Sequence, residues 1–260
     1  MKTTALITGA SSGIGLELAK IHAAKGGDLL LVARNIERLN ELKTELESRY
    51  KVSVVVLQKD LSLSESAIEV YQEVLKREIQ VDILINNAGF GDFGEFKESN
   101  YARFTEMIEL NVRTLTQLTH LFLKAMSKQG HGRILNLASV AAFQSGPLMA
   151  VYYATKAYVL SFSEAVSYEL RNTGITLTTL CPGPTTSGFS SAASLGNSKL
   201  FNSSRIPSSL EVATMGYEAM LKGKSVVIHG WKYQLLIFMQ RFIPRSWSLA
   251  AIGKIQGKLS

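Results

Sequence analysis

The chain has 260 residues, of which 46% are hydrophobic and only 19% are charged. This charged share is below the roughly 25% of a typical soluble domain, and the composition excludes a disordered chain. Twenty-eight lysines and arginines against 21 acidic residues give a formal net charge of +7. The single cysteine, Cys181, excludes an internal disulfide and a cysteine-based zinc site, so we expect a reducing, cytoplasmic location.

The N-terminus carries no recognisable targeting segment. A short apolar run begins directly after the first three residues, without the long apolar core or the cleavage site of a signal peptide. Residues 134–155 and 172–198 lack Asp, Glu, Lys and Arg, but both stretches are rich in polar residues and glycine. We therefore expect no membrane-spanning helix.

Apolar runs alternate with helical patterns from the N-terminus to about residue 230. The helical segments, such as 36–50 and 62–78, carry apolar residues every three or four positions beside charged faces. The apolar runs are typical of parallel strands covered by helices on both sides. We predict these strands at residues 4–8, 29–32, 52–57, 83–85, 133–137, 176–180 and 226–228. The pattern indicates an α/β fold, with one doubly wound parallel sheet in a single domain spanning residues 1–230.

The last 30 residues, 231–260, differ from this domain. They contain five basic residues and no acidic residue, so this tail accounts for five of the seven net positive charges. Aromatic and aliphatic residues recur at helical spacing on both sides of Pro244, which predicts two basic amphipathic helices. Three placements fit: packing on the body or on a partner subunit, peripheral contact with an anionic membrane, or a lid over a substrate pocket. Nucleic acid is not expected as a partner, because no binding motif accompanies the charge.

A glycine-rich turn follows the first predicted strand. Its sequence, TGASSGIG at residues 8–15, joins a strand to the start of a helix. Glycines let the backbone approach a phosphate closely, and the helix N-terminus favours negative charge. The alternative is a tight connection without a ligand. The turn lacks the Gly-Lys-Ser/Thr ending of a nucleoside-triphosphate loop, which disfavours a kinase or an ATPase.

With this turn, the sequence resembles the short-chain dehydrogenase/reductase (SDR) family, and the resemblance extends to about residue 230. It implies a Rossmann-type fold and a nicotinamide cofactor. In the family, Asp60 and Leu61 would lie at the adenine ring, and the motif at residues 86–89 would pass beside the cofactor. The segment after the sixth strand would flank the nicotinamide, with Thr185 or Thr186 replacing the usual threonine at Ser187. The contacts that the resemblance implies for the cofactor are Gly9, Ser11, Ser12, Gly13, Ile14, Gly15, Asp60, Leu61, Asn87, Ala88, Gly89, Pro182, Gly183 and Thr185.

The end of the second strand indicates which cofactor is used. NAD enzymes place an acidic residue there to bind the ribose 2′-hydroxyl, whereas a 2′-phosphate is better matched by a guanidinium group. Here Ala33 occupies the acidic position and Arg34 follows it. We therefore predict NADP(H). The alternative is that Arg34 is an ordinary surface residue at the start of the next helix.

Four residues form the expected reacting centre. Tyr152 and Lys156 are four residues apart in a helical pattern, so they share one helix face, and an ammonium group next to a phenol favours the phenolate. Tyr153 lies three residues from Lys156 and is the alternative. The family pattern Tyr-x-x-x-Lys selects Tyr152. The resemblance adds Ser139 as the partner of the substrate oxygen and Asn111 as the holder of a water molecule in a proton relay.

The mechanism that the resemblance implies is hydride transfer between a nicotinamide and a carbonyl or alcohol. Tyr152 would exchange a proton with the substrate oxygen, and Lys156 would lower the pKa of Tyr152 and bind the ribose of the cofactor. We expect no metal, because the four histidines do not cluster. The alternative is a dinucleotide-binding redox sensor or scaffold without turnover. The resemblance also implies a homodimer or homotetramer.

The sequence also predicts a flap and an apolar pocket on the substrate side of the site. Residues 188–207 have few regular signals and suit a flap over the substrate. Several apolar residues lie near the expected mouth and predict a pocket for an apolar, lipid-like carbonyl or alcohol. These residues are Phe90, Phe93, Phe143, Leu148, Met149 and Phe189.

Overall fold

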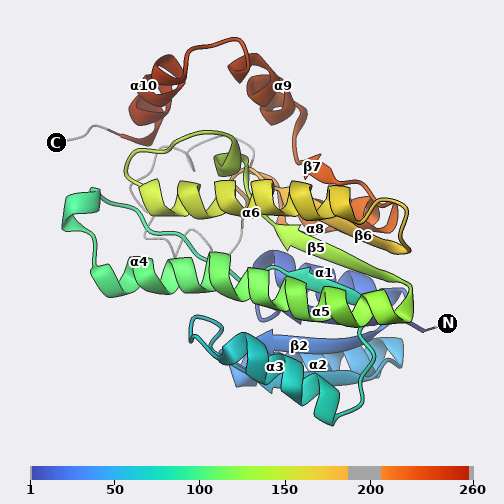
Figure 1. Cartoon of the computed structure of the whole chain (residues 1–260). Helices are drawn as coiled ribbons and strands as arrows, with labels where there is room; N and C mark the ends of the chain where they lie inside the picture. Colours follow the sequence, from blue (N-terminus) through green and yellow to red (C-terminus); the bar gives the residue numbers. More distant parts are fainter. Residues whose placement is uncertain (1, 187–205, 258–260) are drawn as a thin grey trace.

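A computed structural model describes residues 2–186 and 206–257 of the chain. Seven parallel strands form one sheet in the order β3-β2-β1-β4-β5-β6-β7 (Figure 1). After β3 the chain crosses back to place β4 on the other side of β1, and this reversal opens a crevice at the carboxyl ends of the strands. The predicted doubly wound parallel sheet is confirmed.

All seven strands lie within two residues of their predicted positions, because each is a compact apolar run. Their bounds are β1 Thr4–Thr8, β2 Asp28–Ala33, β3 Val54–Gln58, β4 Ile83–Asn86, β5 Gly132–Leu137, β6 Ile175–Cys181 and β7 Val226–Ile228.

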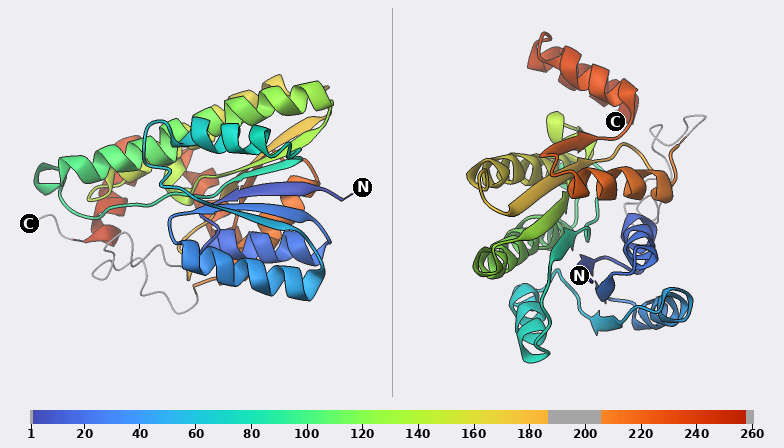
Figure 2. Two further views of the ribbon diagram at one scale, coloured as in Figure 1. Left: turned by 90° about the horizontal axis from the view of Figure 1, so that it is seen from below. Right: turned by 90° about the vertical axis from the view of Figure 1, so that its right-hand side faces the viewer.

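Helices cover both faces of the sheet (Figure 2). One face carries α1 (Gly13–Ala24), α2 (Ile36–Tyr50) and α8 (Ser209–Leu221). The other face carries α3 (Ser66–Lys76), α5 (Leu115–Gln129) and α6 (Ala150–Glu169). Shorter segments connect them: η1 (Phe96–Glu98), α4 (Tyr101–Ile108), the π-helical η2 (Glu109–Thr114) and η3 (Val140–Phe143).

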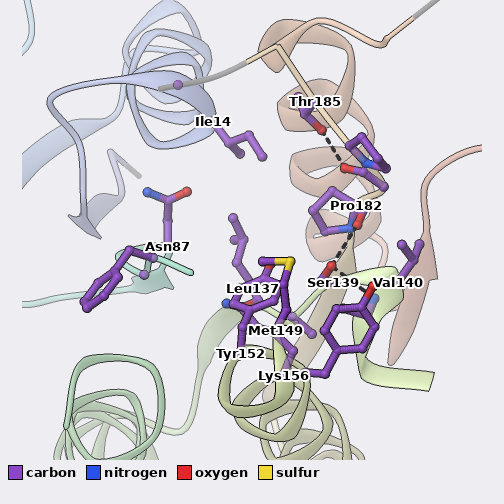
Figure 3. A pocket seen from close by; sticks show the side chains of 18 of the residues that line it. Ile14, Asn87, Leu137, Ser139, Val140, Met149, Tyr152, Lys156, Pro182 and Thr185 are labelled. Carbon is purple, nitrogen blue, oxygen red and sulfur yellow. Dashed lines mark hydrogen bonds between the residues drawn. The ribbon is translucent and has the colours of Figure 1, made fainter. Parts of the chain in front are cut away.

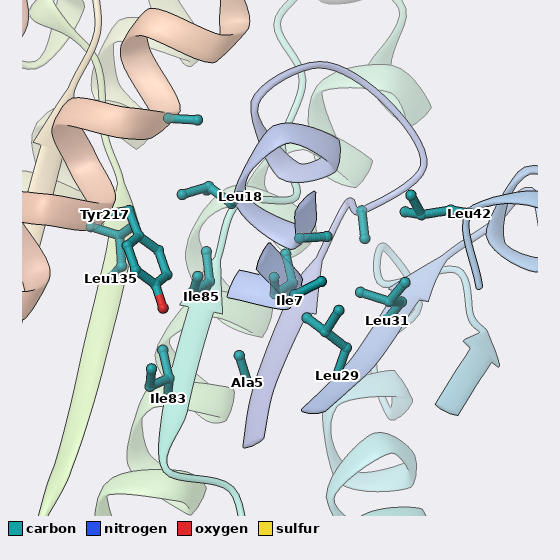
Figure 4. Packing of buried hydrophobic residues seen from close by; sticks show 14 of the residues in the cluster. Ala5, Ile7, Leu18, Leu29, Leu31, Leu42, Ile83, Ile85, Leu135 and Tyr217 are labelled. Carbon is teal, nitrogen blue, oxygen red and sulfur yellow. The ribbon is translucent and has the colours of Figure 1, made fainter. Parts of the chain in front are cut away.

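Successive strand residues pack into different cores. In β1, Ala5 and Ile7 face α1 and its neighbours, whereas Leu6 faces the opposite layer of helices. Figure 4 shows the first of these cores, with side chains of four adjacent strands meeting helix residues such as Leu18. Because both faces are buried, these strands are apolar throughout rather than alternating.

A buried polar network joins the strands that carry the candidate site. The Asn86 amide donates to Asn136 Oδ1 at 2.9 Å, and the Asn136 amide donates to Ser163 Oγ at 3.0 Å. These bonds connect β4, β5 and α6. Buried amides need such partners, so the network fixes how α6 lies against the end of β5.

Two helices form the tail, α9 (Trp231–Gln240) and α10 (Arg245–Gln256), and they lie outside the two helical layers (Figure 1). The Gln240 amide donates to Gln144 Oε1, and the Gln256 amide donates to the Tyr153 hydroxyl at 2.6 Å. Among the described residues, no helix is long and apolar enough to cross a bilayer. The predicted flap at residues 188–207 lies almost entirely outside the described residues.

Candidate active site

A cavity of about 840 Å³ opens at the carboxyl ends of the strands. The turn after β1 and the ends of β2, β4, β5 and β6 form its walls, and the two tail helices border it as well. In open α/β sheets ligands bind at this edge, at the point where the strand order reverses.

The glycine-rich turn adopts a conformation that requires its glycines. Gly9 and Gly13 have φ angles of +66° and +57°, which favour glycine. A Cβ atom at Gly15 would lie 2.4 Å from the Gly9 carbonyl oxygen, so Gly15 lets the turn fold tightly on α1. The side chain of Ser12 does not cap α1. The start of this helix can therefore serve a phosphate group, as the sequence predicted.

Thr8 and Asn87 hold the turn against β4. The Thr8 hydroxyl accepts hydrogen bonds from the backbone N–H groups of Asn87 and Ala88, each at 3.0 Å. The Asn87 amide donates to the carbonyl oxygens of Thr8 and Gly9 at 2.9 and 3.1 Å. Asn87 thus lines the cavity and also fixes the shape of the turn.

Arg34 lies at the rim of the cavity, before the second helix rather than in it. Asn35 is the N-cap of α2 and accepts a hydrogen bond from the Arg38 backbone at 2.8 Å. The Arg34 side chain is 75% exposed, and its Nη1 lies 3.9 Å from Asp60 Oδ2. Although partial burial opposes the shift, hydrogen bonds from Ser62 and the charge of Arg34 lower the pKa of Asp60.

Tyr152 and Lys156 project from α6 into the cavity, as their spacing predicts (Figure 3). Both side chains are buried. Lys156 Nζ donates to the Leu137 carbonyl at 2.8 Å and lies 5.9 Å from the centre of the Tyr152 ring. The carbonyl at the end of β5 therefore positions the lysine next to the phenol.

Burial dominates the proton affinities of this pair. Burial raises the pKa of Tyr152 above its ordinary value, and a hydrogen bond with Ser139 opposes that shift. Burial also lowers the pKa of Lys156 to about 8, against the opposing influence of Cys181. That Lys156 lowers the pKa of Tyr152 stays a prediction. Near neutral pH the phenol of Tyr152 is therefore uncharged, whereas the charge of Lys156 is sensitive to pH.

Ser139 lies just after β5, beside Tyr152. Its hydroxyl caps η3 by accepting from the Ala141 backbone at 3.1 Å, and it donates to the Pro182 carbonyl at 3.4 Å. These contacts hold the hydroxyl at the cavity wall, on the same side as Tyr152 and Lys156 (Figure 3). A polar oxygen of a substrate placed there would meet both hydroxyl groups.

Asn111 lies behind this wall rather than in it. Its amide donates to the Phe90 carbonyl at 2.9 Å and to Thr155 Oγ1 at 3.1 Å. A Cβ atom added at Gly89 would lie 2.9 Å from Asn111 Oδ1 and 3.5 Å from Lys156 Nζ, so both side chains lie against this glycine. The residue occupies the π-helical segment η2, a geometry often found at functional sites.

The segment after β6 closes the opposite end of the site. The Pro182 carbonyl accepts from the Val140 backbone at 2.9 Å, and the Thr185 hydroxyl donates to the Gly183 carbonyl at 2.9 Å. A Cβ atom at Gly183 would lie 2.5 Å from the Tyr233 ring, so the tail helix α9 packs directly on this segment. Ser187 lies outside the described residues.

The cavity gathers nearly all of the predicted site residues; only Gly15 and Asn111 lie behind its surface. Of the predicted apolar pocket, Phe90 and Met149 line the cavity, and Phe189 lies outside the described residues. Three do not line it: Phe93, Phe143 and Leu148.

Sequence reasoning missed several residues of the wall. From the body these include Lys59, Val140 and Gln144, and from the tail Tyr233, Leu236, Ile237, Met239, Gln240, Ile243, Trp247, Ser248, Ala251 and Ile252. Most of these tail residues are apolar at helical spacing, which indicated a buried face but not what that face covers. In the part of the chain that the structure describes, no cluster of His, Cys, Asp and Glu suits a metal ion.

Comparison with known proteins agrees with this architecture. The family model for short chain dehydrogenase matches residues 3–197. An uncharacterized oxidoreductase of Staphylococcus epidermidis is 31% identical over 202 residues, covering 78% of this chain and 86% of that protein. A very-long-chain 3-oxoacyl-CoA reductase of Pyrenophora tritici-repentis is 36% identical over 177 residues, covering 66% of this chain and 52% of the reductase.

A solved structure shows the same likeness in three dimensions. A short-chain dehydrogenase from Sphingobium yanoikuyae in complex with NADPH superposes with a TM-score of 0.83 at 30% identity, covering 92% of this chain and 94% of that one. The chain belongs to the short-chain dehydrogenase/reductase family of oxidoreductases, whose members bind a nicotinamide dinucleotide. The glycine turn, with a backbone cradle that side chains would fill, fits such a cofactor.

Proposed function

We propose that the protein is an NADP(H)-dependent oxidoreductase that reduces an apolar ketone or aldehyde, or oxidises the corresponding alcohol. The observation that carries this proposal is the meeting of Ser139, Tyr152 and Lys156 on one wall of a cavity that also contains the glycine turn. A binding protein would need the turn but not this buried acid–base group.

The bound nicotinamide supplies or accepts the hydride. Ser139 and Tyr152 hold the substrate oxygen through their hydroxyl groups, and Tyr152 gives it a proton during reduction. Lys156, kept in place by the Leu137 carbonyl, stabilises the phenolate that this transfer leaves behind. Asn111 and Lys156 both lie against Gly89, and Asn111 also bonds to the Phe90 carbonyl, so a proton relay from the lysine would continue there.

The catalytic assignment is tested by replacing Tyr152 with Phe. We expect kcat for carbonyl reduction to fall by about 10²–10⁴-fold, because general acid catalysis is lost, while the Kd for NADPH stays close to the wild-type value. The measurement is steady-state reduction of an apolar ketone, with NADPH binding followed by calorimetry.

Tyr153→Phe is the matched control, since it removes the neighbouring hydroxyl from the same helix turn. It should leave kcat within about threefold of wild type, as a change outside the reacting group does. If Tyr152→Phe keeps full activity, the catalytic assignment fails. A dinucleotide sensor without turnover, the alternative function, predicts no carbonyl reduction by any variant or by the wild type.

Support for NADP(H) comes from Arg34 and from the NADPH complex of the Sphingobium relative. Arg34 is exposed at the cavity rim and free to reach a 2′-phosphate, although its guanidinium also lies near Asp60. We expect Arg34→Ala to raise the Kd for NADPH about 10–100-fold, the value of a charge-assisted contact, and to leave the Kd for NADH nearly unchanged. Tighter binding of NADH than NADPH by the wild type would refute the assignment.

An apolar substrate is supported by the cavity wall. Side chains of Leu236, Ile237 and Trp247 from the tail line the same cavity as the reacting group, together with Met149 from the body. The similarity to a very-long-chain 3-oxoacyl-CoA reductase points to long-chain carbonyls among the candidates. A panel of long-chain 3-oxoacyl esters, steroids and simple aldehydes, followed by NADPH absorbance, distinguishes these classes. Preference for small polar aldehydes would contradict this part of the proposal.

A further inference from the structure

The tail helix α9 is apolar on two opposite sides. One side, with Tyr233, Leu236 and Ile237, borders the cavity. On the other side, Trp231, Leu235 and Phe238 are three or four positions apart and so form one row along the helix, and Phe242 follows in the turn after it. None of these four residues lines the cavity. The members of this outer row are exposed by 69%, 52%, 53% and 70% at Trp231, Leu235, Phe238 and Phe242.

This outer row is a continuous apolar strip rather than scattered single residues. The rings of Phe238 and Phe242 pack edge to face with their centres 5.5 Å apart. On α10, Leu249 adds further exposed apolar surface outside the cavity wall. Helices that are apolar all round are normally covered on every side, and large exposed apolar patches mark interaction sites. The outer side of the tail is therefore expected to bind another surface.

The charges beside the strip indicate what kind of surface that partner has. Lys232, Arg241, Arg245 and Lys254 are exposed, and the sequence has no acidic residue from position 231 onward. None of the ion pairs among the described residues involves these four side chains. A two-fold contact with a second copy would bring like charges together. On an anionic lipid surface, the cations instead contact phosphate groups and the aromatic rings are buried at the level of the headgroups.

We propose that the outer side of α9 and α10 docks on an anionic membrane surface, with both helices lying in the headgroup plane. Trp231, Phe238 and Phe242 insert between the lipids, and the neighbouring basic residues contact the phosphates. The opposite side of α9 then lies between the bilayer and the cavity. If the proposed function holds, an apolar carbonyl dissolved in the membrane has a short path past the tail to Tyr152.

Vesicle co-sedimentation of the whole protein tests the docking without any substrate. The probes are vesicles of phosphatidylcholine alone and of phosphatidylcholine mixed with phosphatidylglycerol. We expect binding to the mixed vesicles only, weakened by high salt because the charges are exposed. The double variant Phe238→Ser/Phe242→Ser and the double variant Arg241→Glu/Arg245→Glu should each weaken it at least about tenfold.

Matched variants on the body of the protein provide the controls. Phe96→Ser/Tyr101→Ser removes two equally exposed aromatic residues, and Lys124→Glu/Lys128→Glu reverses two exposed charges on α5. Both should bind vesicles like the wild type, and all variants should keep the wild-type Kd for NADPH, which shows that they are folded.

Three outcomes would overturn the docking proposal: no binding to anionic vesicles, equal losses in the tail and control variants, or a smaller sedimentation coefficient in the tail variants alone. The last would show that the strip is a protein interface. The Tyr152→Phe variant should bind vesicles normally. Failure of the proposed enzymatic function and failure of the membrane docking are therefore seen in different measurements.

Discussion

Lys156 is a buried ammonium whose charge the proposed chemistry needs. Its Nζ donates to the carbonyl of Leu137, which compensates part of the cost of taking the charge out of water. Burial nevertheless lowers its pKa to about 8, within the range in which enzymes operate. The protonation state of this one side chain should therefore set the upper pH limit of the reaction.

We expect kcat for reduction to fall as the pH rises through about 8, because neutral Lys156 no longer stabilises the phenolate of Tyr152. Tyr152 itself stays protonated in this range, since burial raises its pKa. The measurement is a pH profile of kcat at saturating NADPH. In Lys156→Arg the guanidinium stays charged, so the remaining activity should not fall at this pH. A wild-type profile that is flat across this range would contradict the role given to Lys156.

Residue spacing predicted that Tyr152 and Lys156 share one face of a helix. Asn111 was indicated only by the family resemblance. Four residues make about one helical turn, so the pair had to share a face once the helix was recognised. The position of Asn111 depends on the π-helical segment η2, which no local propensity in Glu109–Thr114 indicates. Tyr153 was kept as an alternative because both tyrosines lie near the lysine. In the structure Tyr153 accepts a hydrogen bond from Gln256, 103 residues away, and the choice of Tyr152 stays a prediction.

At the scale of elements, His22 joins α1 to α8. Its Nδ1 lies 2.7 Å from the Tyr217 hydroxyl and its Nε2 lies 3.2 Å from the Thr3 carbonyl. A carbonyl only accepts, so Nε2 carries the proton and Nδ1 accepts from Tyr217. Burial lowers the pKa of His22, which keeps this neutral form bound between the two helices.

Folding stability should therefore fall in acid through His22. The unfolded chain binds a proton at a pKa near 6.5, whereas the folded chain resists protonation, so the stabilisation is complete above about pH 6.5 and is lost below it. We expect Tm to drop as the pH falls through 6, and this drop to be smaller in His22→Gln. The control is His120→Gln on the exposed side of α5. Equal pH slopes in wild type and His22→Gln would contradict this account.

Strand positions were predicted closely because most strands are buried on both faces, and an apolar run has clear ends. Helix α3 was predicted from residue 62 but begins at Ser66. The reason is local: Asp60 accepts hydrogen bonds from the backbone and hydroxyl of Ser62, which holds the preceding residues in a turn. Such side-chain bonds compete with the helix and leave no trace in hydrophobic periodicity.

At the scale of the whole molecule, the tail forms part of the cavity wall. The sequence left three placements open for its helices, since amphipathic periodicity shows that a face is buried but not against what. The structure places α9 and α10 along the cavity, in contact with Gln144 and Tyr153. These contacts join residues about a hundred positions apart, and only the folded sheet brings them together.

The bond between Gln256 and Tyr153 offers a test of whether the tail acts as a lid. Both side chains are buried, and the amide donates to the hydroxyl at 2.6 Å. Removing either partner should loosen the end of α10 and raise KM for a bulky apolar ketone, with kcat and NADPH binding little changed. Because the same bond is lost in either case, the effects of Gln256→Leu and Tyr153→Phe on KM should not be additive.

A double-mutant cycle on KM, together with hydrogen exchange of α9 and α10, measures this coupling. We expect a coupling energy of about 0.5–1.5 kcal/mol, the net value of a buried neutral hydrogen bond, and faster exchange of the tail in all three variants. Gln80→Ala is the control, because it removes an exposed amide that bonds to the nearby Asp82 and lies far from the tail in the sequence. It should change neither the coupling energy nor the exchange of the tail. Additive effects on KM, or unchanged exchange in the tail, would show that α9 and α10 form a fixed wall of the cavity instead of a lid, because a fixed wall does not depend on one bond at its end.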